Sequence, residues 1–150
     1  MEVDERTPER LRELMASPPH LKPDGQDYYG IGIVAKHLNL SVHTLRWYER
    51  IGLLGDIARD ERGQRRFRNS DVEWLHFINR MRLTGMPITD MVEYANLLRQ
   101  GDTTIPQRQN LLEAHRQNLI ASVERLQSTL AIVTYKIELC QQQFAAKDRI

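Results

Sequence analysis

The stretch SVHTLRWYERIGLL, residues 41–54, brings hydroxyl, imidazole, guanidinium, indole and phenol groups close together in the sequence. Arginine offers paired donors to guanine or phosphate, and hydroxyl, imidazole and indole groups hydrogen-bond phosphates and base edges. A lone outward arginine is ordinarily just solvated, but this set of donors in one short stretch indicates contact with nucleic acid. The side chains left to project outward, once cap and core positions are assigned, are His43, Thr44, Arg46, Trp47 and Arg50.

The charge distribution supports the same interpretation. The whole chain has a net charge of only +1, but residues 42–68 contain seven arginines against four acidic residues, seven minus four giving +3. A local excess of arginine is typical of a surface that meets phosphate. The second half of this basic stretch adds the DNA-contact candidates Arg59, Arg62, Arg65 and Arg66.

Several other classes of protein are excluded by what the sequence lacks. It contains no G-x-S-x-G, phosphate-binding loop or H-E-x-x-H motif, so we do not expect an enzyme. Cys140 is the single cysteine and the histidines show no ligand spacing, so we expect no disulfide, no metal site and no cofactor. No apolar run approaches the roughly 20 residues that span a bilayer, and the acidic start does not resemble a signal peptide. A cytoplasmic protein without membrane contact is expected.

The elements that must position the basic stretch can be predicted from periodicity. Residues 1–27 mix charges with prolines and predict a flexible extension. A short helix follows from Tyr28, with a buried stripe ending at Leu38, and Ser41 is a good N-cap for a second helix that ends at Gly52. Residues 54–68 have the turn formers of a hairpin. Together these elements predict a winged helix-turn-helix domain over residues 28–100.

Two further helices complete that predicted domain. Ser70 and Glu73 have the spacing of a capping box, which opens a helix that stops near Gly85. Thr89 is the predicted cap of the next helix, which closes at Gly101.

The last segment, residues 101–150, has a heptad period instead. No proline or glycine occurs between Gln107 and Ile150, so one helix of about 60 Å is feasible. A lone amphipathic helix of that length needs a partner to cover its seam, most simply a second copy of itself. The predicted dimerisation positions, which are the apolar a and d residues, are Leu112, Leu119, Val123, Leu126, Leu130, Val133 and Ile137.

These motifs together resemble the MerR family of bacterial transcription regulators. The resemblance is carried by IGIVAKHLNLSVHTLRWYERIGLL, RDERGQRRF and DVEWLHFINRMRLTGMPI, in that order, followed by the heptad helix. It implies a mainly α fold, a dimer held by an antiparallel coiled coil, a winged domain in the major groove, and distortion of promoter DNA used by RNA polymerase. By similarity, Trp47 and Tyr48 take the two aromatic positions near the phosphates, which adds Tyr48 to the DNA-contact candidates. Ser41, at the predicted cap, is a further candidate.

The sequence gives less information about the effector to which such a regulator would respond. The segment after GMPI is similar to a short-tailed branch associated with aldehyde or thiol stress, but Asn79 stands where that branch commonly has a cysteine. Cys140 occupies a d position, where a small apolar filler is the simpler interpretation and a redox sensor the alternative. The sequence therefore predicts a DNA-binding regulator with an unidentified effector. The alternative is a coiled-coil adaptor whose winged domain binds protein.

Overall fold

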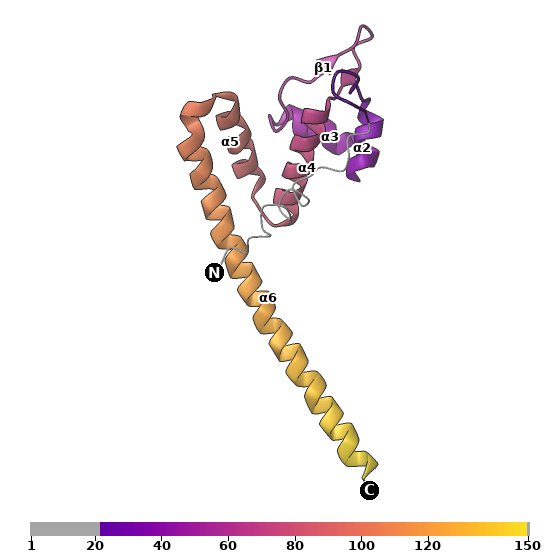
Figure 1. Cartoon of the computed structure of the whole chain (residues 1–150), viewed down its shortest axis with the longest axis vertical. Coiled ribbons are helices and arrows are strands. Elements are labelled where there is room, and N and C mark those ends of the chain that lie inside the picture. The colour runs from indigo at the N-terminus through magenta and orange to yellow at the C-terminus, as the bar shows by residue number, and fades with distance from the viewer. Residues whose placement is uncertain (1–21, 150) are drawn as a thin grey trace. The chain divides into compact units, whose positions relative to one another are not determined.

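The computed structural model describes residues 22–149 of the 150-residue chain and is mainly helical (Figure 1). The first 21 residues of the expected extension, 1–27, lie outside the described part. The elements in chain order are α2 Ile31–Leu38, α3 Val42–Arg50, β1 Ala58–Arg59, β2 Arg65–Arg66, α4 Asn69–Leu83, α5 Ile88–Arg99, the 3-10 turn η1 Asp102–Thr104 and α6 Ile105–Asp148. The predicted winged helix-turn-helix followed by one long helix is confirmed.

The helix-turn-helix forms where its local signals place it. Helix α2 ends at Asn39, whose φ of 53° is left-handed, a conformation that asparagine tolerates. The Ser41 hydroxyl accepts a hydrogen bond of 3.0 Å from the backbone amide of Thr44 and so caps α3. After α3, Gly52 adopts a φ of 84°, which is accessible to glycine without steric cost. The predicted cap and stop of α3 are therefore confirmed.

The wing is a two-stranded antiparallel hairpin. Ala58 pairs with Arg66 and Arg59 with Arg65. One carboxylate oxygen of Asp60 accepts from the backbone amides of Arg62 and Gln64, each at 2.9 Å, which fixes the turn between the strands.

Helices α4 and α5 begin differently from the sequence prediction. The predicted Ser70–Glu73 capping box is wrong, because α4 begins at Asn69. The Asp71 carboxylate accepts from the backbone amide of Arg68 at 2.9 Å, and Asp27 accepts from that of Asn69 at the same distance. Acceptors from two other positions thus satisfy the first amides of α4.

The predicted Thr89 cap is also wrong. Helix α5 begins at Ile88, with Pro87 as its N-cap, so Thr89 already lies inside the first turn. Proline suits this boundary because its φ is fixed near the required value and it has no amide to satisfy.

A short segment before α2 is built into the domain by buried polar groups. Asp27 is buried, and its two carboxylate oxygens accept from the backbone amides of Gly25 and Asn69. The buried Asn69 also accepts from the Tyr29 hydroxyl at 2.7 Å and donates to the Lys22 carbonyl at 3.0 Å. The hydrogen bonds from the amides of Asn69 and Gly25 hold the pKa of Asp27 below its ordinary value of 3.8, although its burial opposes this. Residues 22–27, predicted to belong to the extension, thus contact the start of α4.

One apolar core holds the winged domain together. It joins α2, α3, the wing and α4 across the turn that follows α3. Its largest fully buried side chains are Tyr48, Phe67, Leu45, Leu53, Leu75, Ile78 and Val34. Because α3 contributes Leu45 and Tyr48 to this core, the opposite face of the helix is left outward.

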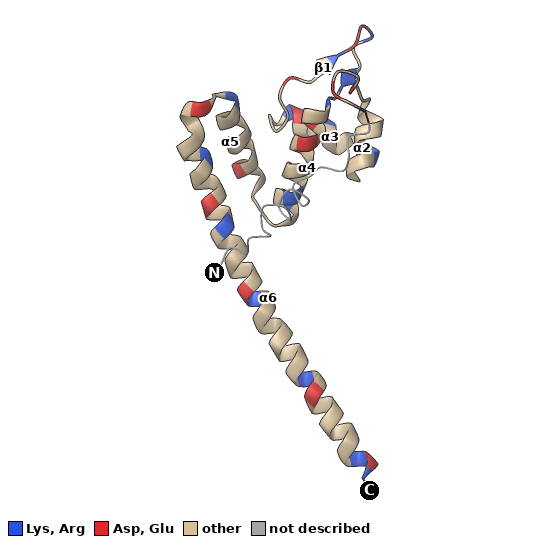
Figure 2. Ribbon diagram, viewed as in Figure 1, with Lys and Arg blue, Asp and Glu red and all other residues tan. Residues whose placement is uncertain are grey.

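The chain divides into two units, with the boundary within α6 after Arg108. Helix α6 is continuous over 44 residues, which corresponds to about 66 Å at 1.5 Å per residue. Its second half has few charged residues and long uncharged stretches (Figure 2). Among the described residues, no helix is both long and apolar enough to cross a membrane.

Candidate nucleic-acid interface

The outward face of α3 carries the polar side chains that the sequence singled out. His43, Arg46, Trp47 and Arg50 are exposed and Thr44 is half-buried. The Thr44 hydroxyl lies 2.8 Å from that of Ser41, so the two hydroxyls share a hydrogen bond at the start of the helix. The helical period brings the four exposed groups to one surface, since the core holds the opposite side.

Tyr48 does not belong to this surface. Its side chain has an exposed fraction of 0%, and its hydroxyl is a buried polar atom with no hydrogen-bond partner among the described residues. Its ring lies 5.6 Å from that of Trp47, centroid to centroid, and Trp47 is 39% exposed. The predicted DNA contact of Tyr48 is therefore corrected: the tyrosine packs in the core and supports Trp47, which reaches the surface.

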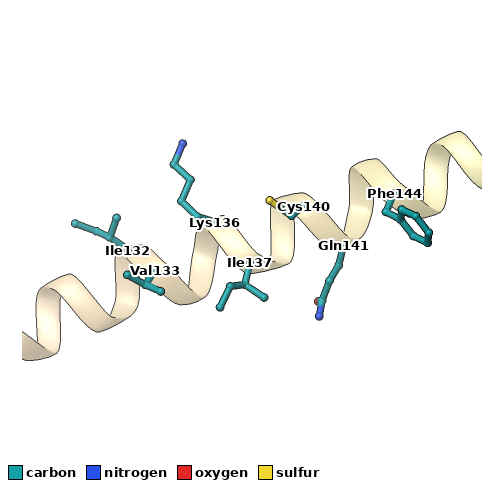
Figure 3. A pocket seen from close by; sticks show the side chains of 7 residues that line it. All are labelled: Ile132, Val133, Lys136, Ile137, Cys140, Gln141 and Phe144. Atoms are coloured by element: carbon teal, nitrogen blue, oxygen red, sulfur yellow. The ribbon is translucent and has the colours of Figure 1, made fainter.

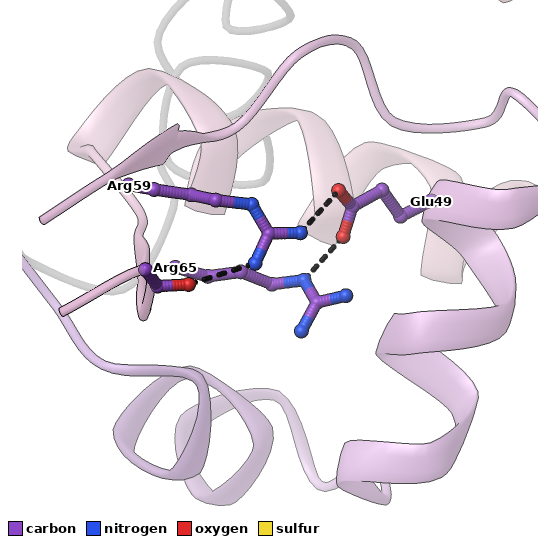
Figure 4. A network of polar contacts seen from close by, with 4 residues as sticks. Glu49, Arg59 and Arg65 are labelled. Carbon is purple, nitrogen blue, oxygen red and sulfur yellow. Dashed lines mark hydrogen bonds and ion pairs between the residues drawn. The ribbon is translucent and has the colours of Figure 1, made fainter.

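Two wing arginines are held by a carboxylate of α3 (Figure 4). The Arg65 Nε donates to Glu49 Oε2, and the Arg59 Nη2 lies 3.5 Å from Glu49 Oε1. Arg59 also donates to the Gly63 carbonyl at 2.9 Å. Arg59 and Arg65 face each other across the two strands, so both point toward the same residue of α3. In the sequence Glu49 counts only as a negative charge, because no local spacing reveals that it binds arginines 10 and 16 residues later.

The other arginines of the wing lie elsewhere. Arg62 is exposed in the turn. The Arg66 guanidinium carbon lies 4.1 Å from the centroid of the Tyr28 ring, which is a cation–π contact. Arg68, which sequence reasoning did not select, stacks on the same ring at 5.0 Å and donates to the Tyr28 hydroxyl at 3.0 Å. The structure thus brings the candidates of α3 together with Arg59 and Arg65, and places Arg66 beside Tyr28.

The arrangement combines a fixed cationic wing with an exposed polar helix face. Glu49 neutralises part of the wing charge but also restricts the guanidinium groups in space, which lowers the entropy lost when they bind a ligand. Arg46, Arg50 and Arg62 are exposed cations for phosphate or base edges. The surface is therefore suited to bind a nucleic acid, whose backbone is anionic and whose bases present hydrogen-bonding edges.

The predicted dimerisation residues follow one stripe of α6. Leu112 and Leu119 are half-buried, whereas Val123, Leu126, Leu130, Val133 and Ile137 are exposed. Figure 3 shows the distal part of the helix, where Val133, Ile137 and Phe144 project from the ribbon and are 49%, 53% and 72% exposed. Cys140 is an exposed free thiol, and Lys136 projects on the same side of the helix.

Comparison with known proteins is consistent with this geometry. Residues 29–113 match the MerR HTH family of regulatory proteins. The chain is 33% identical over 114 residues to an HTH-type transcriptional regulator of Haemophilus influenzae, covering 76% of this chain and 84% of that protein. It is 41% identical over 90 residues to the HTH-type transcriptional regulator AdhR of Bacillus subtilis, covering 60% and 64% of the two chains.

A solved structure adds a view of a related protein on DNA. The crystal structure of HiNmlR, a MerR family regulator lacking the sensor domain, bound to promoter DNA, superimposes with a TM-score of 0.71. Its sequence is 33% identical, and the match covers 79% of this chain and 94% of that one.

Proposed function

Since the chain belongs to the MerR family of helix-turn-helix transcriptional regulators, we propose that it binds promoter DNA as a homodimer in the cytoplasm. In this proposal, binding distorts the promoter and so changes its use by RNA polymerase, in response to an unidentified small-molecule or stress signal. The observation that carries the proposal is the outward face of α3, where exposed donors lie beside a wing whose arginines are fixed by Glu49.

We assign α3 to the major groove as the recognition helix. His43 and Arg46 are exposed in its first half, and the helix diameter suits the width of the groove. Trp47 can donate its indole N–H to a phosphate, and Arg50 supplies a cation at the far end. The wing arginines then contact the neighbouring backbone, with Arg62 at the tip.

The apolar stripe of α6 supports the homodimer. Leu126 is 70% exposed and Leu130 is 65% exposed in the single chain, which is unusual for leucines spaced by a heptad pattern. An antiparallel coiled coil with a second copy covers both and places two recognition helices on one duplex. A two-fold DNA site then matches the two-fold protein.

A titration with the chain's own upstream promoter region tests the proposal. The wild-type protein is expected to bind that duplex more tightly than a shuffled duplex of equal length. Arg46→Ala is expected to weaken binding to both duplexes and to lower the salt slope by about one for a lost phosphate contact. Arg82→Ala is the matched control, because the exposed Arg82 lies on α4, outside the proposed interface, and its side chain donates to the Asn79 side-chain oxygen at 3.0 Å.

Two results would contradict the proposal. Equal affinity of the wild-type protein for both duplexes would show that it does not read a sequence. No binding to either duplex would favour the adaptor function, in which the winged domain binds protein.

A further inference from the structure

The C-terminal end of α3 leaves two carbonyl groups outside the helical hydrogen-bond pattern. Beyond the C-cap Ile51, the amides of Gly52 and Leu53 turn back to the carbonyls of Glu49 and Tyr48, at 3.2 and 2.9 Å. The carbonyls of Gly52 and Leu53 lie beyond the end of the helix, where no amide of a following helical turn can bond them, so they need other partners. Leu53 is fully buried, so an unpaired carbonyl there would be costly.

Two side chains from other helices supply those partners. The indole Nε1 of Trp74, on α4, donates to the Leu53 carbonyl at 2.8 Å. The guanidinium of Arg99, at the end of α5, donates to the Gly52 carbonyl. The Leu53 carbonyl is thus held by a side chain of α4, and the Gly52 carbonyl by a side chain of α5.

Both donors are themselves held in place. Arg99 also donates to the Asn96 side-chain oxygen at 2.7 Å, one turn earlier on α5. The Trp74 ring stacks on Phe77 with centroids 5.6 Å apart, and on Tyr94 of α5 with centroids 6.0 Å apart. These contacts restrict the rotamers of the donors, so the carbonyls they bind are restricted as well.

We propose that Trp74 and Arg99 are positioning residues for DNA recognition, which set the angle of α3 by clamping its C-terminal end. This inference rests on the proposed function, in which α3 reads the major groove. Neither residue is placed in contact with DNA. They act through the Gly52 and Leu53 carbonyls, and we call the two hydrogen bonds the clamp.

Recognition depends on the clamp because a small tilt at the end of α3 displaces the start of the helix. From Gly52 back to His43 the helix rises about 13 Å at 1.5 Å per residue, so a tilt of about 5° moves His43 by about 1 Å. That displacement exceeds the range of about 0.5 Å over which an N–H···O hydrogen bond keeps its strength. Base-edge contacts near the start of α3 are therefore sensitive to the position of its end.

The clamp also links α3 to the beginning of the long helix. The Thr104 hydroxyl donates to the Leu97 carbonyl of α5 at 2.6 Å, and Arg108 in the first turns of α6 donates to that hydroxyl at 3.2 Å. These contacts join the first turns of α6 to the last turn of α5, which also carries Arg99. In the proposal, a shift in the first turns of α6 moves this last turn and so changes the angle of α3.

The test compares Trp74→Phe, Arg99→Ala and the double variant with wild type and with the control Arg82→Ala. Trp74→Phe removes the N–H donor and keeps one of the two rings for stacking on Phe77 and Tyr94. A thermal unfolding midpoint close to wild type shows that each variant is folded. Amide hydrogen exchange reports on the free protein, and titrations with the promoter duplex and a shuffled duplex report on recognition.

The clamp predicts a specific pattern of results. In the double variant, the amides of Leu53 and Leu54 exchange faster, and affinity for the promoter falls about tenfold, the effect of one lost base contact. Affinity for the shuffled duplex and the salt slope stay unchanged, because no phosphate contact is removed. Arg99→Lys keeps a donor and restores much of the promoter affinity.

Three results would overturn the inference. Unchanged exchange in the double variant would show that the clamp does not hold the helix end. Faster exchange with unchanged promoter affinity would make the clamp merely structural, and a salt slope lowered by about one would make Arg99 a phosphate contact. A wild-type protein that does not discriminate between the duplexes would overturn the proposed function, and that outcome is visible before any variant is made.

Discussion

Replacing Leu126 and Leu130 together by lysine should dissociate the homodimer. Full burial of a leucine side chain contributes about 2 kcal/mol, and the two leucines still have 70% and 65% of their surface to bury. The expected loss is therefore about 2.7 kcal/mol per chain and about 5 kcal/mol per dimer from burial alone. At 1.4 kcal/mol per factor of ten, the dimer dissociation constant rises at least about 10³- to 10⁴-fold. The like charges brought together add to this effect.

Sedimentation equilibrium over a range of concentrations measures the shift directly. The matched control is the double substitution of Ile132 and Tyr135 by lysine, since these residues are 61% and 58% exposed and lie on the opposite side of α6. The control is expected to remain dimeric. An intact dimer for the Leu126 and Leu130 variant, or dissociation of the control alone, would refute the assigned seam.

Three further predictions concern the wing, the start of α4 and the thiol. Glu49→Gln should lower the unfolding free energy by about 1 kcal/mol. It should also narrow the difference in affinity between promoter and shuffled duplexes, because the wing arginines lose their anchor; denaturant unfolding and parallel titrations measure this. Since the folded state lowers the pKa of Asp27, its stabilisation is complete above the ordinary value of 3.8 and is lost as the pH falls through the lower folded value. Asp27→Asn should therefore lower the unfolding midpoint at neutral pH and flatten its acid dependence. If an antiparallel coil crosses near Leu126, two Cys140 sulfurs lie about 40 Å apart, so diamide should give no intersubunit disulfide band on a denaturing gel.

The helix-turn-helix and the wing could be predicted because their signals are local. Ser41 bonds to an amide three residues away, and Gly52 adopts the left-handed conformation that its type favours. The start of α4 could not be predicted in the same way. Its first amide is satisfied by Asp27, 42 residues earlier, and no local pattern reveals that partner.

In the candidate site too, features set by local sequence could be predicted, whereas features set by distant residues could not. Helical period correctly placed His43, Arg46 and Trp47 on the outside, because the core side of α3 is marked by apolar residues. It also placed Tyr48 on the core side, and the DNA contact that the family resemblance suggested for it conflicts with its burial. The hydrogen bond from Arg99 to Gly52 spans 47 residues, so it depends on the tertiary fold rather than on spacing.

A hydroxyl-radical footprint of the wild-type protein on its own upstream promoter region tests the central claim most directly. Two protected segments related by a two-fold axis are expected, one for the recognition helix and wing of each subunit, with weaker protection of both in Arg46→Ala at the same protein concentration. Uniform cleavage at saturating wild-type protein, or a single protected segment without symmetry, would contradict it.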